Sequence, residues 1–476
     1  MRILLGVVAA ITALAQAPAW YQTDFPPEEF RARWNKIYDK IGDQAIAVLQ
    51  GVPLTPGFVM PRQSNEFYYL SGVETPHSYL LLDGRTRKAT LYLPPQNRRL
   101  EAAEGKVLSA NDADEVRRLT GVDEVLSTEL MRDNWLGKLP GAPIRTVYTP
   151  LTPAEGNAQP RFELNQTNAA IANDAWDGRL SRELHFEALI RARNPRVVVN
   201  DLTPIIDQMR SVKSTREIAV IRRASEIAGQ GMLEAMRSSK PGVHEYELDA
   251  AARYVYLVNG ARLDGYRSII AAGTQNIANM HYFRNIATLD NGQMVLMDYA
   301  PEYRYYTSDI GRMWPVNGKF APWQRELLQL VLDYRNAVMK RIRPGVTARQ
   351  IMDEAKAAME PVFARTKFSK PDYEKAAREL VEKGGGVFSH PVGMAVHDDG
   401  EYIREPLKPG QVISIDPALR VPSENLYLRY EDTIVITATG YENFTEFLPA
   451  ELDAIEAVVR GGNGIVQKLP PGPAPH

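Results

Sequence analysis

The stretch GQMVLMDYA, at residues 292–300, decides how this chain folds, because it recurs as GQVISIDPA at residues 410–418. Each copy reads as a turn glycine, an apolar strand and then an aspartate, which is Asp298 in the first copy and Asp416 in the second. Short apolar runs bounded by turn residues are typical of buried strands. Both copies therefore predict a strand that carries an acidic side chain at its end.

The sequence before each strand repeats as well. A helical pattern over Thr215–Ser238 is followed by Pro-Gly-Val at 241–243, and another over Gln324–Ile342 is followed by Pro-Gly-Val at 344–346. A further amphipathic helix follows each Pro-Gly-Val. Internal repetition on this scale is a signal about the whole fold. We predict that the C-terminal half is a duplicated helix–turn–helix–strand unit.

Five side chains in this half form a candidate metal site. A second carboxylate follows each aspartate where a returning strand would place it: Asp309 lies 11 residues after Asp298, and Glu431 lies 15 residues after Asp416. His390 lies between the two pairs. Four carboxylates and one imidazole suit two divalent cations, and the imidazole favours Mn, Co, Zn or Fe over Mg or Ca. Two such cations can activate water and polarise a carbonyl group, which is hydrolytic chemistry.

A plainer alternative is that the acidic residues are turn residues and that the histidine is structural. It is disfavoured because Asp298 ends an apolar strand rather than a polar loop. Arg429 and Glu431 are expected on one face of a single strand over Leu426–Thr437, because side chains in a strand alternate with period two. Arg429 is therefore expected to steady the carboxylates or the substrate. Arg312 is predicted to be a structural ion-pair partner.

The composition describes an ordinary soluble globular protein. The chain has 476 residues, of which 44% are hydrophobic and 24% charged, and its net charge is −2. That length allows two or three domains with ample core. The absence of a basic tract disfavours nucleic acid as a partner. The chain has no cysteine, which excludes disulfides, thiolate zinc sites and a cysteine nucleophile.

The first 17 residues predict an export signal. Arg2 supplies a positive charge, Ile3–Leu14 is an apolar run, and Ala-Gln-Ala fits the small-residue cleavage rule. A buried N-terminal helix is the alternative, and it is disfavoured because the run is too short to span a membrane and is followed by Pro18. We expect a mature protein that begins near Pro18 and acts in the periplasm or outside the cell.

Two domains and a tail are expected after this signal. Residues 18–195 mix helices with short strands and predict an N-terminal α/β domain; residues 196–465 hold the duplicated half; and residues 466–476 form a Pro-rich tail predicted to be disordered. Within the first domain, a helix is predicted over Glu28–Ile41 and a loop over Thr149–Pro160. Its predicted strands are Ala45–Leu49, Tyr79–Leu82 and Ala89–Leu93.

These residues together resemble the metallopeptidase family of aminopeptidase P, prolidase and methionine aminopeptidase. MRSVKSTREI at 209–218 is similar to that family's entry into its catalytic domain, and FYYLSGVE at 67–74 resembles the N-terminal domain of the aminopeptidase P branch. RYED at 429–432 resembles the setting of the family's last metal ligand. The ordered set that resembles the family's metal ligands is Asp298, Asp309, His390, Asp416 and Glu431. The resemblance implies an α/β (α+β) protein with a C-terminal pita-bread domain.

The resemblance also implies a function. It implies an Xaa-Pro aminopeptidase that holds two divalent metal ions, with Mn²⁺ as first choice and Co or Zn as alternatives. The catalytic residues would be His281, His397 and Asp416, and the two histidines and Arg429 would bind substrate. The substrates would be peptides with proline at the second position. We expect no nucleic acid, no membrane anchor and a homo-oligomer. The alternatives are an Xaa-Pro dipeptidase (prolidase) and a metal-free pita-bread binding protein.

Two positions depart from the family pattern. The family usually has glutamate where this chain has Asp416, and that glutamate is thought to relay a proton from the attacking water. The shorter side chain can still ligate a metal, but it moves the carboxylate by about one carbon–carbon bond, or about 1.5 Å. Aminopeptidase P and prolidase also carry a histidine four residues before the ligand histidine. Here Gly386 stands at that position.

The predicted export signal can be tested directly. Protein isolated from its native host should have a mature N-terminus near Pro18, because signal peptidases cleave after small residues at this distance from an apolar run. Mass spectrometry of the intact protein measures this. Recovery of a chain that still begins with Met1 in the cytosol would contradict the prediction.

Overall fold

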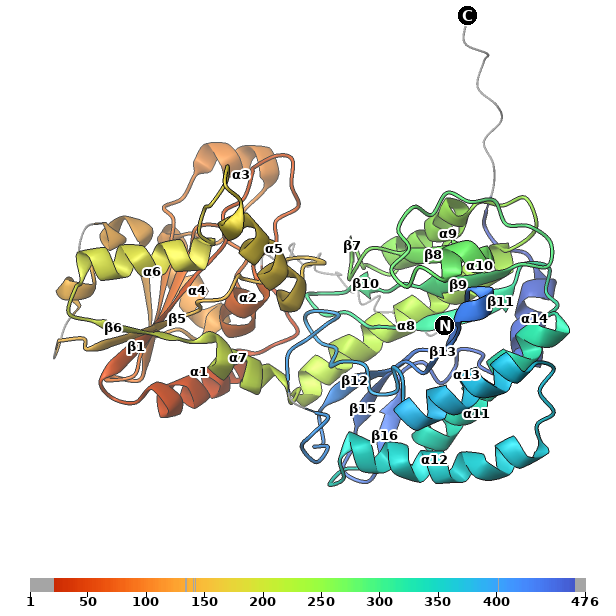
Figure 1. The fold of residues 1–476 in the computed structure, drawn as a ribbon. Coiled ribbons are helices and arrows are strands. Elements are labelled where there is room, and N and C mark those ends of the chain that lie inside the picture. Colours follow the sequence, from red (N-terminus) through yellow and green to blue (C-terminus); the bar gives the residue numbers. More distant parts are fainter. Residues whose placement is uncertain (1–20, 133–134, 140, 142, 401, 467–476) are drawn as a thin grey trace, which may run out of the picture.

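The structure is a computed structural model that describes residues 21–466 except 133, 134, 140, 142 and 401. The predicted export signal and all but the first residue of the predicted tail lie outside the described residues. The chain forms two lobes (Figure 1), an N-terminal one in red to yellow and a C-terminal one in green to blue. The helix α7 (Thr203–Arg210) and the long α8 (Thr215–Ser238) connect them.

The N-terminal lobe is built on a six-stranded sheet in the order β4-β3-β2-β1-β5-β6. The first three strands in sequence pair antiparallel, whereas β4, β5 and β6 join in parallel. Its strands are β1 (Ala45–Gln50), β2 (Tyr79–Asp83), β3 (Lys88–Leu93), β4 (Glu124–Ser127), β5 (Thr146–Thr149) and β6 (Val198–Asp201). Its helices are α1 (Pro27–Ile41), α2 (Asn65–Ser71), α3 (Arg98–Glu104), α4 (Ala113–Thr120), α5 (Arg161–Asn173) and α6 (Arg182–Arg193), with short 3₁₀ turns at Ala110–Asp112, Thr128–Met131 and Leu136–Lys138.

The local predictions for this lobe agree with the structure. The helix α1 buries Phe30, Trp34 and Ile37 on one face, as the 3.6-residue period indicated. The indole N–H of Trp34 donates a hydrogen bond of 2.7 Å to the carbonyl of Leu70, so this buried polar atom is satisfied. The three predicted strands are β1, β2 and β3, and the predicted loop joins β5 to α5.

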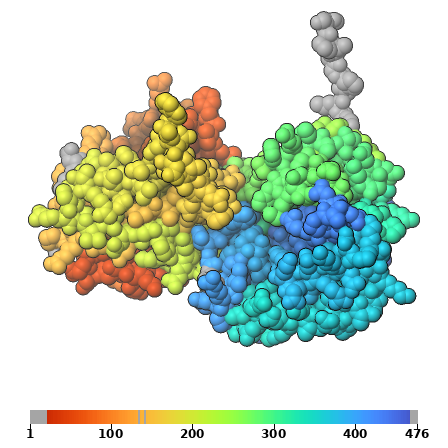
Figure 2. All heavy atoms as spheres, in the orientation of Figure 1, coloured from red at the N-terminus to blue at the C-terminus, as the bar shows by residue number. Residues whose placement is uncertain are grey.

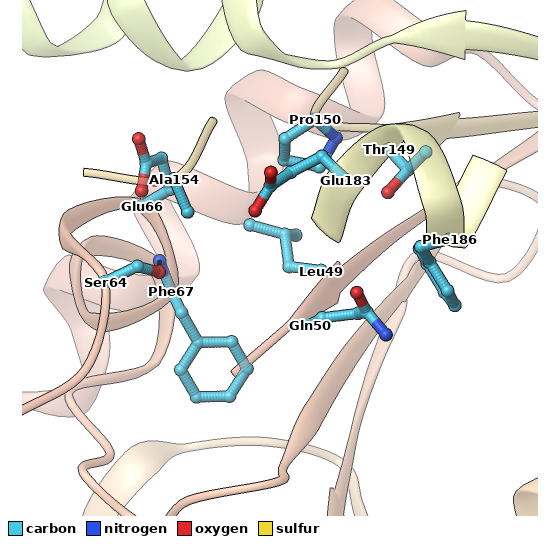
Figure 3. A pocket seen from close by; sticks show the side chains of 10 residues that line it. All are labelled: Leu49, Gln50, Ser64, Glu66, Phe67, Thr149, Pro150, Ala154, Glu183 and Phe186. Atoms are coloured by element: carbon cyan, nitrogen blue, oxygen red, sulfur yellow. Dashed lines mark hydrogen bonds between the residues drawn. The ribbon is translucent and has the colours of Figure 1, made fainter. Parts of the chain in front are cut away.

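A small cavity lies within this lobe (Figure 3). Phe67, Leu49 and Phe186 line it together with the carboxylate-bearing Glu66 and Glu183. Its volume is about 20 Å³, which is room for about one water molecule. The cavity is therefore a packing feature of the lobe and not a ligand site.

The C-terminal lobe shows the duplication that the sequence predicts. In the first half, α8 and α9 (Glu245–Val258) precede a sheet of β8 (Ile269–Ala272), β9 (Met294–Asp298) and β11 (Gly311–Pro315). In the second, α11 (Pro322–Met339) and α12 (Ala348–Arg365) precede a sheet of β12 (Val412–Ile415), β15 (Asp432–Ile436) and β16 (Tyr441–Asn443). The remaining elements are β7 (Leu263–Asp264), α10 (Gly273–Ile277), β10 (Pro301–Glu302), α13 (Pro371–Lys383), β13 (Ala418–Val421), a 3₁₀ turn at Pro422–Glu424, β14 (Leu426–Arg429) and α14 (Leu452–Gly461).

The two halves differ in one respect that the repeat did not predict. The helix α13 lies between the second helical pair and β12, whereas the short β7, β8 and α10 stand at the corresponding place in the first half. The duplicated unit is therefore a shared frame with different insertions. The frame still brings both acidic strand ends to the same region.

The prediction of one strand over Leu426–Thr437 is wrong. The chain breaks at Tyr430 and Glu431 into β14, which pairs with β13, and β15, which pairs with β12. At the break the backbone of Glu431 pairs with Gly311 instead: the Glu431 N–H donates to the Gly311 carbonyl over 3.0 Å, and the Glu431 carbonyl accepts from the Gly311 N–H over 3.2 Å. The change of partner joins the two halves of the lobe at this point.

A buried ion cluster holds this junction. The guanidinium of Arg312 donates to Asp432 over 2.7 Å and to the carbonyl of Glu431 over 2.7 Å, and Arg335 donates to the other oxygen of Asp432 over 2.6 Å. The side chains of Arg312 and Asp432 are fully buried. Burial by itself raises the pKa of Asp432, but the two guanidinium groups outweigh it and hold that pKa below its usual value. The prediction that Arg312 is a structural ion-pair partner is confirmed.

Removing Asp432 should destabilise the lobe. Asp432→Ala leaves two buried guanidinium groups without their carboxylate, and breaking a buried pair in this way costs about 3–5 kcal/mol. The free energy of unfolding in urea measures it. Asp453→Ala is the matched control, because Asp453 pairs with Arg325 on the exposed surface, where an ion pair contributes at most about 1 kcal/mol.

The same cluster predicts a dependence of stability on pH. Because the folded pKa of Asp432 is depressed, its contribution is present above the unfolded pKa of about 3.9 and is lost as the pH falls through the lower folded value. Lowering the pH below about 4 should therefore reduce the free energy of unfolding more in the wild type than in Asp432→Asn. An equal loss in the two proteins would show that this carboxylate plays no part.

Candidate active site

One cavity contains every side chain that the sequence singled out for catalysis or metal binding. It has a volume of about 560 Å³ and is lined from both lobes. From the C-terminal lobe it receives Asp298, Asp309, His390, Asp416, Arg429, Glu431, His281 and His397. From the N-terminal lobe it receives Pro160, Phe162 and Glu163. The two lobes meet here: Figure 2 shows orange and gold atoms of the N-terminal lobe against blue atoms of the C-terminal lobe.

Strand pairing places the four carboxylates. Asp298 is the last residue of β9 and pairs with Gly311 at the start of β11, which puts Asp309 two residues before the returning strand. In the second half, Asp416 follows β12 directly, and Glu431 directly precedes β15, whose first residue pairs with the last residue of β12. The strand ends therefore present all four carboxylates to one cavity, as the repeat predicted.

Among the described residues, His390, Asp309 and Glu431 form a group whose ligand atoms lie close enough together to hold a metal ion. One ligand atom from each lies within 4.8 Å of the others. The ring Nδ1–H of His390 donates to the carbonyl of Pro391 over 3.0 Å, which leaves Nε2 facing Asp309 at 3.0 Å. A backbone carbonyl on one ring nitrogen is the usual way to orient a metal-binding histidine. Burial raises the pKa of Asp309, but the hydrogen bond and charge of His390, the charge of Arg429 and a hydrogen bond with Glu431 together outweigh it and lower this pKa to about 2.

Arg429 lies among the other carboxylates. Its guanidinium donates to Asp298, to Asp416 over 3.1 Å and to Glu431 over 2.8 Å. The Arg429 side chain is buried. The expectation that Arg429 steadies the carboxylates agrees with these contacts, although Arg429 and Glu431 belong to no common strand.

The site carries more negative charge than its own cations balance. Burial, followed by the nearby carboxylates of Asp309 and Asp298, raises the pKa of Asp416 to about 7 against the opposing pull of Arg429. The pKa of Glu431 also lies well above its usual value, because burial and the nearby carboxylates raise it more than Arg429 lowers it. Asp416 Oδ1 is buried and has no hydrogen-bond partner among the described residues. Four crowded carboxylates and one oriented imidazole form a donor set that fits divalent cations, and Asp416 Oδ1 is an oxygen of this set that no described residue occupies.

The sequence reasoning missed several side chains that position this set. The Tyr266 hydroxyl donates to Asp298 over 2.7 Å, and the Ser414 hydroxyl donates to Glu431 over 3.0 Å. Ser414 lies two residues before Asp416, so strand periodicity could have placed it on the same face. Tyr266 lies in the short connection between β7 and β8, three residues before Ile269, which pairs with Asp298, and no local pattern indicates its role.

Gly386 is tied to the backbone of Asp416. The Asp416 N–H donates to the Gly386 carbonyl over 2.9 Å, and Gly386 has a φ of +75°, which favours glycine. A Cβ at this position would lie 2.0 Å from the carbonyl oxygen of Asp416. The space that a histidine side chain would need at position 386 is therefore filled by the main chain that carries Asp416.

The two histidines expected on the substrate side both line the cavity, in different settings. His281 is exposed, at the mouth formed by the loop after α10. His397 packs its ring edge-on against the ring of His390, with ring centroids 4.4 Å apart. Its Nδ1 lies 2.7 Å from a carboxylate oxygen of Glu163, a residue of α5 that the sequence reasoning did not single out.

Comparison with known proteins identifies the family. Residues 219–438 match metallopeptidase family M24, and residues 30–147 match the N-terminal domain of aminopeptidase P. The Xaa-Pro aminopeptidase of Escherichia coli K12 is 30% identical over 417 residues, which cover 84% of this chain and 89% of that protein. The chain belongs to metallopeptidase family M24.

Solved structures agree with the M24 assignment. Aminopeptidase P from E. coli with the inhibitor Pro-Leu superposes with a TM-score of 0.74 at 27% identity, covering 92% of this chain and 99% of that one. Proline aminopeptidase P II from Yersinia pestis gives a TM-score of 0.71 at 29% identity, covering 91% and 99%. The predicted fold, a pita-bread domain after an aminopeptidase P-like N-terminal domain, is confirmed.

This M24 chain is a metal-dependent aminopeptidase. The family and the relatives carry that conclusion, and the site supplies ligands for divalent metal ions. The assignment of each ligand and of each catalytic side chain stays a prediction. No helix among the described residues has both the length and the apolar character that crossing a bilayer requires.

The metal prediction can be checked by elemental analysis. Purified protein should bind close to two divalent ions per chain, because four carboxylates supply more charge than one cation balances. Asp309→Ala should lose activity and most of the metal, whereas Asp353→Ala, on the exposed side of α12, should keep both. Full activity of a rigorously chelated wild type would rule out a metal-dependent reaction.

Proposed function

We propose that the chain is an Xaa-Pro aminopeptidase that removes the N-terminal residue from peptides whose second residue is proline. The observation that carries the proposal is the convergence of all four carboxylates and His390 in one cavity between an M24 lobe and an aminopeptidase P-type N-terminal lobe. The names of the relatives supply the substrate class: the E. coli and Haemophilus influenzae proteins are Xaa-Pro aminopeptidases.

The five proposed ligands are Asp298, Asp309, His390, Asp416 and Glu431. When bound there, two divalent cations would supply a Lewis acid for the scissile carbonyl and lower the pKa of water. Mn²⁺ is the proposed metal, with Co or Zn as alternatives, since oxygen ligands and one imidazole suit all three.

Side chains of this protein would supply proton transfer, hydrogen-bond donation and positioning of the carboxylates. Asp416 has one carboxylate oxygen without a hydrogen-bond partner among the described residues, and in this proposal it would accept a proton from the attacking water. His281 and His397 line the cavity, and in this proposal they would donate to the carbonyl oxygen as its negative charge develops, or to the substrate beside it. Arg429 keeps three carboxylates in place between turnovers.

Two alternatives are weaker. A metal-free binding protein would have no need for four crowded carboxylates around an oriented imidazole. A prolidase, which is confined to dipeptides, is no better supported by the relatives than an aminopeptidase is. Export of the protein, which depends on residues outside the described part of the chain, and assembly into a homo-oligomer both stay predictions.

Substrate preference tests the proposal. The metal-loaded wild type should release free Xaa from Xaa-Pro-Yaa, and mass spectrometry should find Pro-Yaa as the second product. Replacing proline by alanine, or acetylating the N-terminus, should slow cleavage at least about tenfold, which corresponds to about 1.4 kcal/mol. Equal rates for Xaa-Pro-Yaa and Xaa-Ala-Yaa would refute the proline preference.

Asp416 provides a second test. General acid–base groups contribute about 10²–10⁴-fold, so Asp416→Ala should lose at least 10²-fold in turnover and at least one metal ion. Asp416→Glu keeps a carboxylate and should keep both metals with turnover held or raised. A slower glutamate variant would mean that the backbone, fixed against Gly386, has been adjusted to the shorter side chain. An alanine variant with two metals and near-normal turnover would remove Asp416 from the site.

A further inference from the structure

The first turn of α5 is the part of the N-terminal lobe that reaches the active-site cavity. Phe162 and Glu163 line the cavity beside His397. The turn lies outside both regions that match a family, which end at residue 147 and resume at residue 219. Neither family match describes its contribution to the site.

A buried ion cluster fixes this turn in place. Arg161 is buried and pairs with Glu66 and Asp207, each over 2.5 Å, and with Asp399 over 3.4 Å. Asp399 follows His397 by two residues, so the cluster ties α5 to the segment that carries the histidine. The next two side chains after Arg161 are thereby held over the cavity.

Glu163 has capacity for a further hydrogen bond. One carboxylate oxygen accepts from His397 Nδ1 over 2.7 Å. The other, Oε2, is shielded from solvent and has no hydrogen-bond partner among the described residues. A carboxylate can accept about four hydrogen bonds, and a shielded acceptor left unpaired costs free energy. Because Oε2 is shielded, a donor from a bound peptide would reach it only when the partly exposed Glu163 side chain rotates, and that contact would remove the cost.

We propose that Glu163 selects peptides of three or more residues over dipeptides by accepting the main-chain N–H of the third residue and repelling a C-terminal carboxylate at the same place. The proposal rests on the proposed Xaa-Pro aminopeptidase function and names its substrate class more closely. Glu163 would also act as a positioning residue for His397.

The chemistry of the substrate after the scissile bond supports this role for Glu163. In Xaa-Pro-Yaa the proline nitrogen carries no hydrogen, so the first N–H after the scissile bond belongs to Yaa. In the dipeptide Xaa-Pro that N–H is absent, and a negative carboxylate stands beside the position. A site that needs a donor rejects a substrate that lacks it, and like charges add to the rejection.

The spacing is suitable. One residue of extended chain spans about 3.3–3.6 Å, and one further C–N bond of about 1.3 Å puts the Yaa nitrogen about 4.5–5 Å from the scissile carbonyl carbon. The rings of His390 and His397 are 4.4 Å apart, and Glu163 lies directly beyond His397. A carbonyl bound at the metal ligands, with the proline and Yaa directed toward α5, would point the Yaa N–H toward the wall of the cavity that holds Glu163.

The charges on this wall have the required sign. Asp398 and Asp399 line the cavity beside Glu163. Asp398 is balanced by Arg210 and Lys213. Glu163 itself faces a histidine and no arginine or lysine within 4.0 Å among the described residues. Arg267 lines the cavity as well, with its guanidinium over the ring of Phe283.

The test uses the metal-loaded full-length enzyme, two variants and four substrates. Wild type, Glu163→Gln and Glu163→Ala are assayed for kcat/KM on Xaa-Pro, Xaa-Pro-amide, Xaa-Pro-Ala and Xaa-Pro-(N-methyl)Ala. The wild type should prefer the amide to the free acid and Ala to N-methyl-Ala. In both variants the ratio of tripeptide to dipeptide should fall at least about tenfold, and the effect of N-methylation should shrink by a similar factor.

The ratio separates selection from positioning. If Glu163 only held His397 in place, its removal would lower kcat/KM for all four substrates by one factor and leave the ratios unchanged. Glu187→Gln is the matched control: Glu187 lies on α6, where it pairs with Arg191 at the surface, and its substitution should leave all four values near wild type.

Each outcome decides a separate point. A wild type that does not cleave Xaa-Pro-Ala refutes the proposed function itself. A wild type that cleaves it, with variants whose ratios equal those of the wild type, refutes the role of Glu163 alone. If both variants fail to fold, the wild type alone still tests the inference. Absence of its preference for the amide over the free acid, or for the unmethylated over the methylated peptide, overturns the inference. A dipeptide preference that disappears in Arg267→Gln would place the leaving side against Arg267 and also overturn it.

Discussion

The crowding of four carboxylates in one buried cavity is the constraint on which the catalytic lobe depends. Burial and mutual repulsion raise the pKa of Asp298, Asp416 and Glu431, and the guanidinium of Arg429, which lies among them, offsets only part of this. Such an arrangement is stable only when the surrounding backbone holds it and a cation shares the charge. The strand ladders, the Arg312–Asp432–Arg335 cluster and the orienting hydroxyls all serve that requirement.

The duplicated frame is a simple solution to this problem. Each half ends a strand in one carboxylate and returns a second through the neighbouring strand, so two similar units supply four ligands from two directions. The junction at Glu431 and Gly311 locks the halves together at the point where the ligands meet. Because both halves must be in register for the cavity to form, the site and the fold are specified by the same backbone pairs.

Much of this was readable from the sequence, for a physical reason. A glycine, an apolar strand and an aspartate form a local pattern, and its recurrence at residues 292–300 and 410–418 needed no knowledge of distant contacts. The second carboxylates followed from the expectation that a strand returns. The break between β14 and β15 was not readable, because alternation reports which residues share a face and not which sheet a strand joins. Tyr266 and Glu163 were not readable either, since each reaches the site from a segment without a repeating pattern.

The contact between Gly386 and Asp416 has a consequence for how this protein can vary. Because a Cβ at position 386 would overlap the carbonyl of residue 416, the side chain at one position and the course of the backbone at the other form a single choice. A histidine introduced at 386 alone would push the ligand strand out of register, and a longer acid at 416 alone would inherit a backbone fitted to glycine. The two positions are coupled through the main chain, so a side chain at position 386 requires a shift of the backbone at position 416.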